Sequence, residues 1–209
     1  MRTEILGAAT RLFATRGFDG TSVQDVADAV GIKKPSVLHH FESKEALRQA
    51  VLDGLLLRWN ETLPALLVAA SAGEGQFDAV VREVVAFFAR DADRARLLIR
   101  EGLDRPDDVR ERLGRHLAPV FENLARYLRK GRERGAVHAD LDPEAYLFQM
   151  VTLLVCGIAF GDSFGALLPE HARRGKSRER LTREIARIGR SALFRAPGTQ
   201  KQRARASRA

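Results

Sequence analysis

Residues 21–44 read TSVQDVADAVGIKKPSVLHHFESK and contain three helix starts and one glycine turn. Thr21 begins a T-x-x-Q capping box, a pattern that starts helices. Gly31 stands where a left-handed residue ends the first helix, and Pro35 can open the second because the first helical position needs no N–H. Ser43 can cap a third helix. Two short helices joined by a glycine-containing turn indicate a helix-turn-helix, which places its second helix in the major groove of DNA.

Residues before, within and at the end of the motif extend this pattern. They are Ile5-Leu6, Ala8-Ala9, Leu12-Phe13 and Gly17-Phe18 before the motif, Val23 and Ala27 within it, and His39-His40-Phe41 and Ser43-Lys44-Glu45-Ala46-Leu47 at its end. This ordered series resembles the N-terminal DNA-binding domain of TetR-type (TetR/AcrR) transcriptional regulators and covers about the first quarter of the chain. The resemblance implies a three-helix DNA-binding domain followed by a helical domain that binds an effector and dimerises.

The rest of the sequence is also typical of helices. Ala, Leu, Arg and Glu dominate, β-branched alternation is scarce, and 45% of the residues are hydrophobic, so we expect an all-α globular chain. We predict a DNA-binding domain over residues 1–48 (motif 21–41), an effector-binding and dimerisation domain over 49–195, and a disordered basic tail over 196–209. The pattern predicts helices at about 3–15, from 44 to a kink or end at Pro64, and at 77–89, 92–103, 107–134, 143–164 and from Ser177 onward.

The net charge of +8 comes from the end of the chain and not from the motif. Residues 171–209 carry thirteen Lys or Arg and two Asp or Glu, a net of +11, which leaves −3 for residues 1–170. The high isoelectric point is therefore no argument for DNA binding by the motif itself. A nucleoid-type protein, whose basic tail binds DNA without sequence preference, is the alternative to a site-specific regulator.

Polar and basic residues of the motif are the candidate DNA contacts. They are Thr21, Ser22, Lys33, Lys34, Pro35, Ser36, Leu38, His39, His40 and Lys44. The three lysines lie at or just before helix starts, where the helix dipole disfavours cations, so a bound phosphate explains them better than a tolerated surface charge. The resemblance implies phosphate contacts for Thr21, Ser22 and Lys44.

The second helix of the motif carries the residues that would read bases. These candidates are Lys34, Ser36, Leu38 and His39, with phosphate contacts setting the register. Leu38 departs from the tyrosine that is usual in the family, and leucine cannot hydrogen-bond a phosphate; either that contact is lost or the operator is read differently. We expect no metal ion at His39 and His40, because adjacent helical residues point about 100° apart.

Two segments near the end of the chain fit a dimer interface. Glycines spaced by four along one helix let another backbone approach closely, although glycines that only loosen and end a helix are the alternative. An apolar stripe on the last helix fits the same role. The resemblance implies a homodimer, and two helices per subunit would form a four-helix interface. The expected interface residues are Gly157, Gly161, Leu181, Ile185 and Ile188.

Large or apolar residues on the central helices are candidates for an effector pocket. They are Trp59, Phe87, Phe88, Leu98, Arg100, Phe121, Tyr127, Phe148 and Cys156. An ordinary packed core is the alternative for most of them. The resemblance implies an effector, which we expect to be small and apolar or amphipathic. Its binding would misplace the two recognition helices and lower the affinity for a near-palindromic double-stranded operator.

The sequence contains no recognisable catalytic motif. We find no nucleophile elbow, phosphate-binding loop or Cys/His metal spacing, so we expect neither an enzyme nor a cofactor or metal. The one cysteine fits a reducing cytoplasm, where we expect a DNA-binding regulator to be nucleoid-associated, and the apolar run 145–161 is short for a membrane span. The sequence therefore predicts a dimeric, effector-responsive DNA-binding regulator, most often a repressor in the resembling family.

Overall fold

The computed structural model describes residues 1–70, 81–86, 92–167, 169 and 177–194, without the side chains of residues 58–70, 162, 177–179, 181 and 182. This part of the chain is helical apart from turns and one isolated β-bridge between Val137 and Phe194, which confirms the all-α class. The helices are α1 (Arg2–Arg16), α2 (Val23–Val30), α3 (Lys34–His40), α4 (Lys44–Ala70), α6 (Ala92–Asp104), α7 (Pro106–Glu133), α8 (Pro143–Ala159), α9 (Gly161–Gly165) and α11 (Ser177–Leu193). Residues 81–86 are also helical.

The first helices enclose an apolar core whose positions follow from helical spacing. Ile5 and Phe13 of α1 are fully buried, and Val26 of α2 and Val37 of α3 pack against them. Gly31 ends α2 in the left-handed conformation, with φ +78°, as predicted. The core therefore holds α3 in place while leaving its other faces on the surface.

The capping box of α2 begins one residue later than the sequence predicted. Ser22 is the N-cap: its hydroxyl accepts the Asp25 N–H at 3.0 Å, and the Asp25 carboxylate accepts the Ser22 N–H at 2.7 Å. The Thr21 side chain is buried and donates to the Gly17 carbonyl at 2.8 Å. The capping role predicted for Thr21 is thus wrong, because its buried hydroxyl is already satisfied inside the domain.

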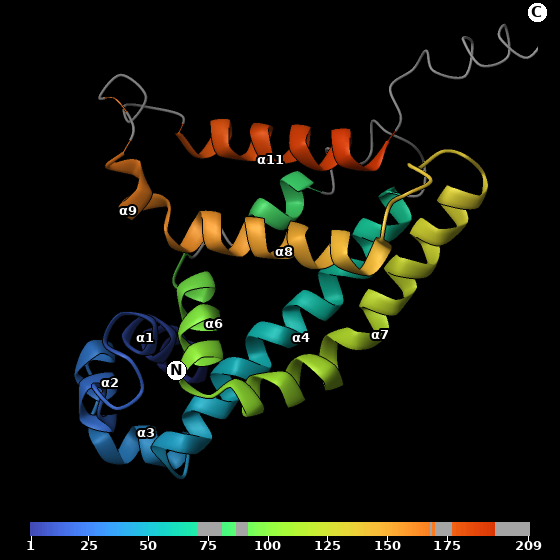
Figure 1. Ribbon diagram of the computed structural model, residues 1–209. Coiled ribbons are helices and arrows are strands. Elements are labelled where there is room, and N and C mark those ends of the chain that lie inside the picture. The colour runs from blue at the N-terminus through green and yellow to red at the C-terminus, as the bar shows by residue number, and fades with distance from the viewer. Residues whose placement is uncertain (71–80, 87–91, 168, 170–176, 195–209) are drawn as a thin grey trace, which may run out of the picture.

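Helix α4 connects the two ends of the molecule. Ser43 caps it as predicted, accepting the Ala46 N–H at 3.0 Å. The helix continues past Pro64 to Ala70, so Pro64 does not end it. Its 27 residues span about 40 Å, and Figure 1 shows it running from beside α3 into the far part of the chain.

The remaining helices form a second core around α7 and α8. Leu117 and Leu128 of α7 pack with Leu154 and Ile158 of α8. The helix predicted over 143–164 is interrupted at Phe160, whose backbone leaves helical geometry, so α8 and α9 are separate. Figure 1 shows α8 and α11 side by side, at the end opposite α2 and α3. None of the helices in the described ranges combines the length and hydropathy needed to cross a membrane.

Candidate nucleic-acid interface

Helix α3 presents a continuous polar surface. The side chains of Lys34, Ser36, His39 and His40 are exposed, and so are those of Lys33, Pro35 and Leu38. Val37 is buried and fixes the opposite face of the helix. The six candidates on α3 and its N-cap residue Lys33 are therefore all exposed, and the helix is short enough for several of them to reach one groove of DNA.

The start of α3 suits an anion. Its N-cap residue is Lys33, which makes no side-chain capping hydrogen bond, and its first turn contains no acidic residue. Helix N-termini carry a partial positive charge, so two lysines at an uncapped start raise the local positive potential. Ser22, the exposed cap of α2, and Lys44, the half-buried first residue of α4, are further candidate phosphate contacts.

Thr21 does not belong to this surface. Its side chain is 1% exposed, and its backbone N–H donates to the Phe18 carbonyl at 3.2 Å. A phosphate would find no free donor at this residue. The DNA contact predicted for Thr21 is wrong for the same reason as its cap: the hydroxyl stabilises the turn between α1 and α2 from inside.

A buried ion network joins α4 to the bend between α6 and α7. Arg48 of α4 is 2% exposed and pairs with Glu101 of α6 and, at 2.6 Å, with Asp108 of α7. It also pairs with Glu45 on its own helix at 2.8 Å. Arg112 continues the network by pairing with Asp108 at 3.0 Å and with Asp53 of α4. One guanidinium therefore contacts three helices, one turn after the start of α4.

The network shifts the ionisation of two carboxyl groups. Burial raises the pKa of Asp108, but hydrogen bonds and charges from Arg48 and Arg112 outweigh it, and the net pKa is lowered. Burial likewise raises the pKa of Glu45, and the hydrogen bond and charge of Arg48, with the charge of Arg105, lower it overall. Both groups therefore stay ionised at neutral pH, which keeps the network intact.

Sequence reasoning missed Arg48 and Arg112. Arg48 lies three and four residues before Val51 and Leu52, which are buried, so helical spacing places it on the inward face of α4. An arginine on an apolar face needs carboxylate partners. The inward position of Arg48 could be predicted from the sequence. The identity of its partners could not, because Glu101 lies 53 positions away.

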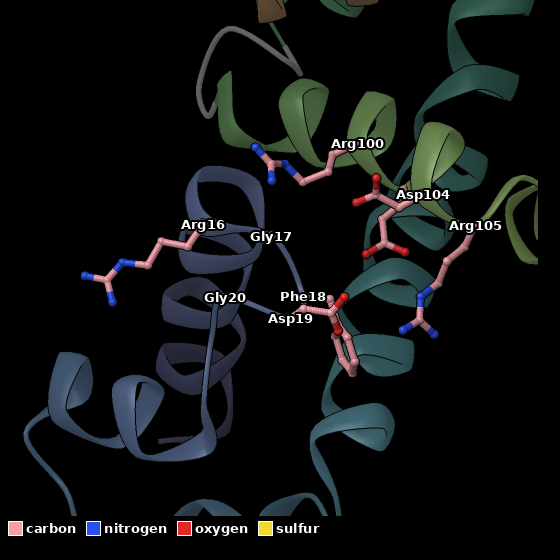
Figure 2. A pocket seen from close by; sticks show the side chains of 9 residues that line it. Arg16, Gly17, Phe18, Asp19, Gly20, Arg100, Asp104 and Arg105 are labelled. Atoms are coloured by element: carbon pink, nitrogen blue, oxygen red, sulfur yellow. The ribbon is translucent and has the colours of Figure 1, made fainter.

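Arg100 lines a hollow at the junction of the two domains. A hollow of about 340 Å³ separates the turn between α1 and α2 from the end of α6 (Figure 2). It is lined by Arg16, Gly17, Phe18, Asp19, Gly20, Arg100, Glu101, Asp104 and Arg105. Gly17 has a φ of +79°, a conformation that favours glycine, and a Cβ there would meet the mobile end of the Arg100 side chain at 2.7 Å. The effector contact predicted for Arg100 stays a prediction.

The other pocket candidates divide into three groups. Phe87, Phe88 and the side chain of Trp59 lie outside the described residues. Leu98 and Phe121 are half-buried against the second core, and Cys156 is half-buried on α8. Tyr127 and Phe148 are 40% and 64% exposed in the single chain, so they do not line its interior. Their helices carry apolar residues on two faces, and periodicity alone did not show which face points inward.

The residues predicted for the dimer interface differ in exposure. Gly161 and Ile188 are exposed, and Gly157 is half-buried. Ile185 is 1% exposed and packs in the second core of its own chain, so it cannot face a partner, contrary to the prediction. The side chain of Leu181 lies outside the described residues. Further apolar side chains exposed on α8, α9 and α11 are Phe148, Leu153, Phe160, Phe164 and Ile188.

Comparison with known families covers most of the chain. The family described as "Bacterial regulatory proteins, tetR family" matches residues 5–51, and "Tetracyclin repressor-like, C-terminal domain" matches residues 74–188. The first match contains α2, α3 and the start of α4, and the second contains α6, α7 and α8.

Similar proteins are transcriptional regulators by name. The repressor KstR2 of Rhodococcus jostii is 51% identical over 55 residues, 26% of this chain and 27% of that protein, so the match spans about a quarter of the relative's length. The repressor DhaR of a Mycobacterium species is 28% identical over 151 residues, 69% of this chain and 73% of that protein.

Solved structures share the fold over nearly the whole chain. The ketosteroid transcriptional regulator KstR2 of Mycobacterium tuberculosis aligns with a TM-score of 0.72 at 18% identity, over 93% of this chain and 95% of that one. The fatty acid degradation regulator FadR of Bacillus halodurans aligns with a TM-score of 0.71 at 17% identity, over 93% and 97%. At these identities the likeness concerns the fold.

Proposed function

The chain belongs to the TetR family of bacterial regulatory proteins, and we propose that it is a dimeric, site-specific repressor that leaves its operator when an effector binds. The observation that carries the proposal is the capped helix-turn-helix, in which buried Val37 and Phe41 hold α3 while its polar side chains face outward. The named repressors among its relatives support the same conclusion.

Helix α3 would lie in the major groove. Lys34, Ser36, Leu38 and His39 would contact base edges, because their side chains are exposed along one short helix. Phosphate contacts would come from Ser22, Lys33 and Lys44 at the edges of the motif. Leu38 would make an apolar contact, such as with a thymine methyl, where a tyrosine would reach a phosphate.

The two copies would meet through α8 and α11. Exposed Phe148 and Phe160 on α8 and its end, with Ile188 on α11, form an apolar surface that a second copy would cover. This end of the molecule lies away from α3, so both recognition helices stay free (Figure 1). Half-sites about 34–36 Å apart, one turn of DNA, would then give a near-palindromic operator.

The effector would bind among the helices of the C-terminal domain. Leu98, Phe121 and Cys156 are half-buried on three neighbouring helices, which favours an apolar or amphipathic ligand. The names of KstR2 and FadR, which refer to ketosteroids and to fatty acid degradation, support the same ligand class. By linkage, an effector that prefers a subunit arrangement with wrongly spaced α3 helices lowers DNA affinity.

The test is the affinity for the DNA that flanks the protein's own coding region, compared with a scrambled duplex at about 150 mM salt. A preference of about a thousandfold or more is expected of a site-specific regulator. Equal affinity for both duplexes would contradict site-specific binding to this DNA and favour sequence-independent binding by the basic end of the chain.

Two histidine variants separate the motif from the rest of the chain. His39→Ala removes an exposed α3 side chain and should reduce the preference for the specific duplex about 5- to 150-fold, since a good base contact contributes about 1–3 kcal/mol. His138→Ala, in the connection between α7 and α8, is the matched control and should leave the preference unchanged. Equal losses in both variants would contradict base reading by His39.

A further inference from the structure

Phe18 is surrounded by cations from two parts of the molecule. It lies in the turn between α1 and α2, and its ring centroid is 4.1 Å from Nζ of Lys44 and 4.6 Å from Cζ of Arg105. The guanidinium carbon of Arg48 lies 5.7 Å from the same centroid. The ring also packs 5.7 Å from the ring of Phe13, which is fully buried. Phe18 is thus fixed to the apolar core while its ring faces charged groups. Figure 2 shows the Phe18 side chain with that of Arg105.

The ammonium group of Lys44 rests on this ring without a carboxylate partner. In the described part of the chain no acidic group lies within ion-pair distance of Lys44. Its neighbour Glu45 pairs with Arg48 at 2.8 Å and with Arg105 at 3.4 Å. The Glu45 carboxylate is therefore engaged by arginines, and the aromatic ring holds the Lys44 ammonium by cation–π attraction.

An aromatic ring and a carboxylate have different consequences for a cation. A carboxylate would neutralise Lys44 and compete with any incoming phosphate. The ring attracts the ammonium through its quadrupole but leaves its full charge available. It also restricts a side chain that has many rotamers, so less conformational entropy is lost when an anion binds.

We propose that Phe18 is a positioning residue for DNA binding: its ring holds the Lys44 ammonium, charged and pre-oriented, at the start of α4 for a backbone phosphate. The proposal rests on the proposed function, because it requires Lys44 to contact DNA. Phe18 itself touches no DNA. Its role is to act through Lys44.

A double-mutant cycle tests the proposal. Phe18→Leu, Lys44→Met and the double variant of the full chain are compared with the wild type for binding to a mixed-sequence duplex of about 30 base pairs, over about 50–250 mM salt. Such a duplex needs no known operator, and the basic end of the chain contributes equally to all four proteins. Thermal unfolding of each variant checks that it folds, and Phe18→Met provides a second ring-free variant with flexible packing.

Lys44→Met should weaken binding and reduce the slope of log affinity against log salt by about one unit. Phe18→Leu should weaken binding about two- to fivefold when Lys44 is present and have no effect in the Lys44→Met background. Phe18→Tyr keeps the aromatic face and should restore wild-type affinity.

Two other results would overturn the proposal, for different reasons. If Phe18→Leu weakens binding equally with and without Lys44, the ring acts only through the structure of the turn, while the phosphate contact stands. If Lys44→Met binds like the wild type with the same salt slope, Lys44 does not contact phosphate; that part of the proposed function fails together with the role of Phe18.

Discussion

Leu47 and Arg48 are neighbours on α4, and both are buried, but they belong to regions held together in different ways. Leu47 is 0% exposed and packs in the apolar core of the DNA-binding domain. Arg48 is 2% exposed and faces the carboxylates of Glu101 and Asp108 at the junction with α6 and α7. One turn of one helix thus contributes to an apolar core and to an ion network.

The two regions differ in how strongly a single substitution destabilises them. An apolar core loses contacts gradually as atoms are removed, because dispersion and burial scale with area. A buried ion network fails when one partner is lost, because the remaining charge is left without water or a counter-ion. The junction between the DNA-binding and C-terminal domains is therefore the region more sensitive to single substitutions.

The largest effect is expected from Arg48→Met. It leaves Glu101, which is 3% exposed, without its partner, and should lower the free energy of unfolding by about 3–5 kcal/mol. Urea unfolding at pH 7, at fixed protein concentration, measures the change. The control is Arg110→Met, which removes the exposed pair with Asp107 and should change the stability by less than about 1 kcal/mol. Similar small losses in both variants would show that the network contributes no more than a surface pair.

Leu47→Ala should lower the free energy of unfolding by about 2–5 kcal/mol, through lost burial and the cavity left behind. Leu47→Met keeps most of the volume and should lose less than about 1.5 kcal/mol. The same urea experiment measures both. If Leu47→Met were as destabilising as Leu47→Ala, shape and not burial would govern this site.

The stability contributed by the ion network should depend on pH in the acid range, whereas that contributed by the apolar core should not. The folded pKa values of Glu45 and Asp108 lie below their ordinary values of 4.5 and 3.8, so their contribution to stability is present above those values and is lost as the pH falls through the folded pKa values. As the pH falls from about 5 through the folded pKa values, the wild type should therefore lose more stability than Arg48→Met, and the two should approach each other. The loss caused by Leu47→Ala should stay constant over this range. A difference in stability between wild type and Arg48→Met that does not shrink at any acid pH at which the wild type stays folded would contradict the network's role.

Whether the sequence could predict a contact depends on how far apart its residues lie along the chain. The buried positions of α1 and α2, such as Ile5, Phe13 and Val26, follow from spacing along one helix, so periodicity was sufficient. The exposed face of α3 followed in the same way, because fixing Val37 inward places its neighbours outward. Because these interactions are local, the helix-turn-helix and its candidate DNA contacts could be predicted from the sequence.

Contacts between residues that are distant in the chain could not be predicted from the sequence. Arg48 and Asp108 are 60 positions apart, and no local pattern specifies that they meet. The cap of α2 was assigned to Thr21 instead of Ser22 because both residue types can cap, and tertiary burial of Thr21 decided between them. The exposure of Phe148 reflects which of two apolar faces of α8 meets the second core, which only packing determines.

The smallest effect is expected at an ion pair with ordinary geometry but no burial. Arg126 and Glu122 lie four residues apart on α7, with 3.2 Å between Nη2 and Oε1, and both side chains are more than half exposed. Water screens this pair and both side chains lose rotamer freedom, so Arg126→Ala should change the free energy of unfolding by no more than about 0.5 kcal/mol. A double-mutant cycle with Glu122→Ala isolates the pair from the helix propensity of alanine. A coupling above about 1.5 kcal/mol would mean that ion pairs stabilise this chain wherever they occur; a value near zero would assign the sensitivity of the Arg48 junction to burial.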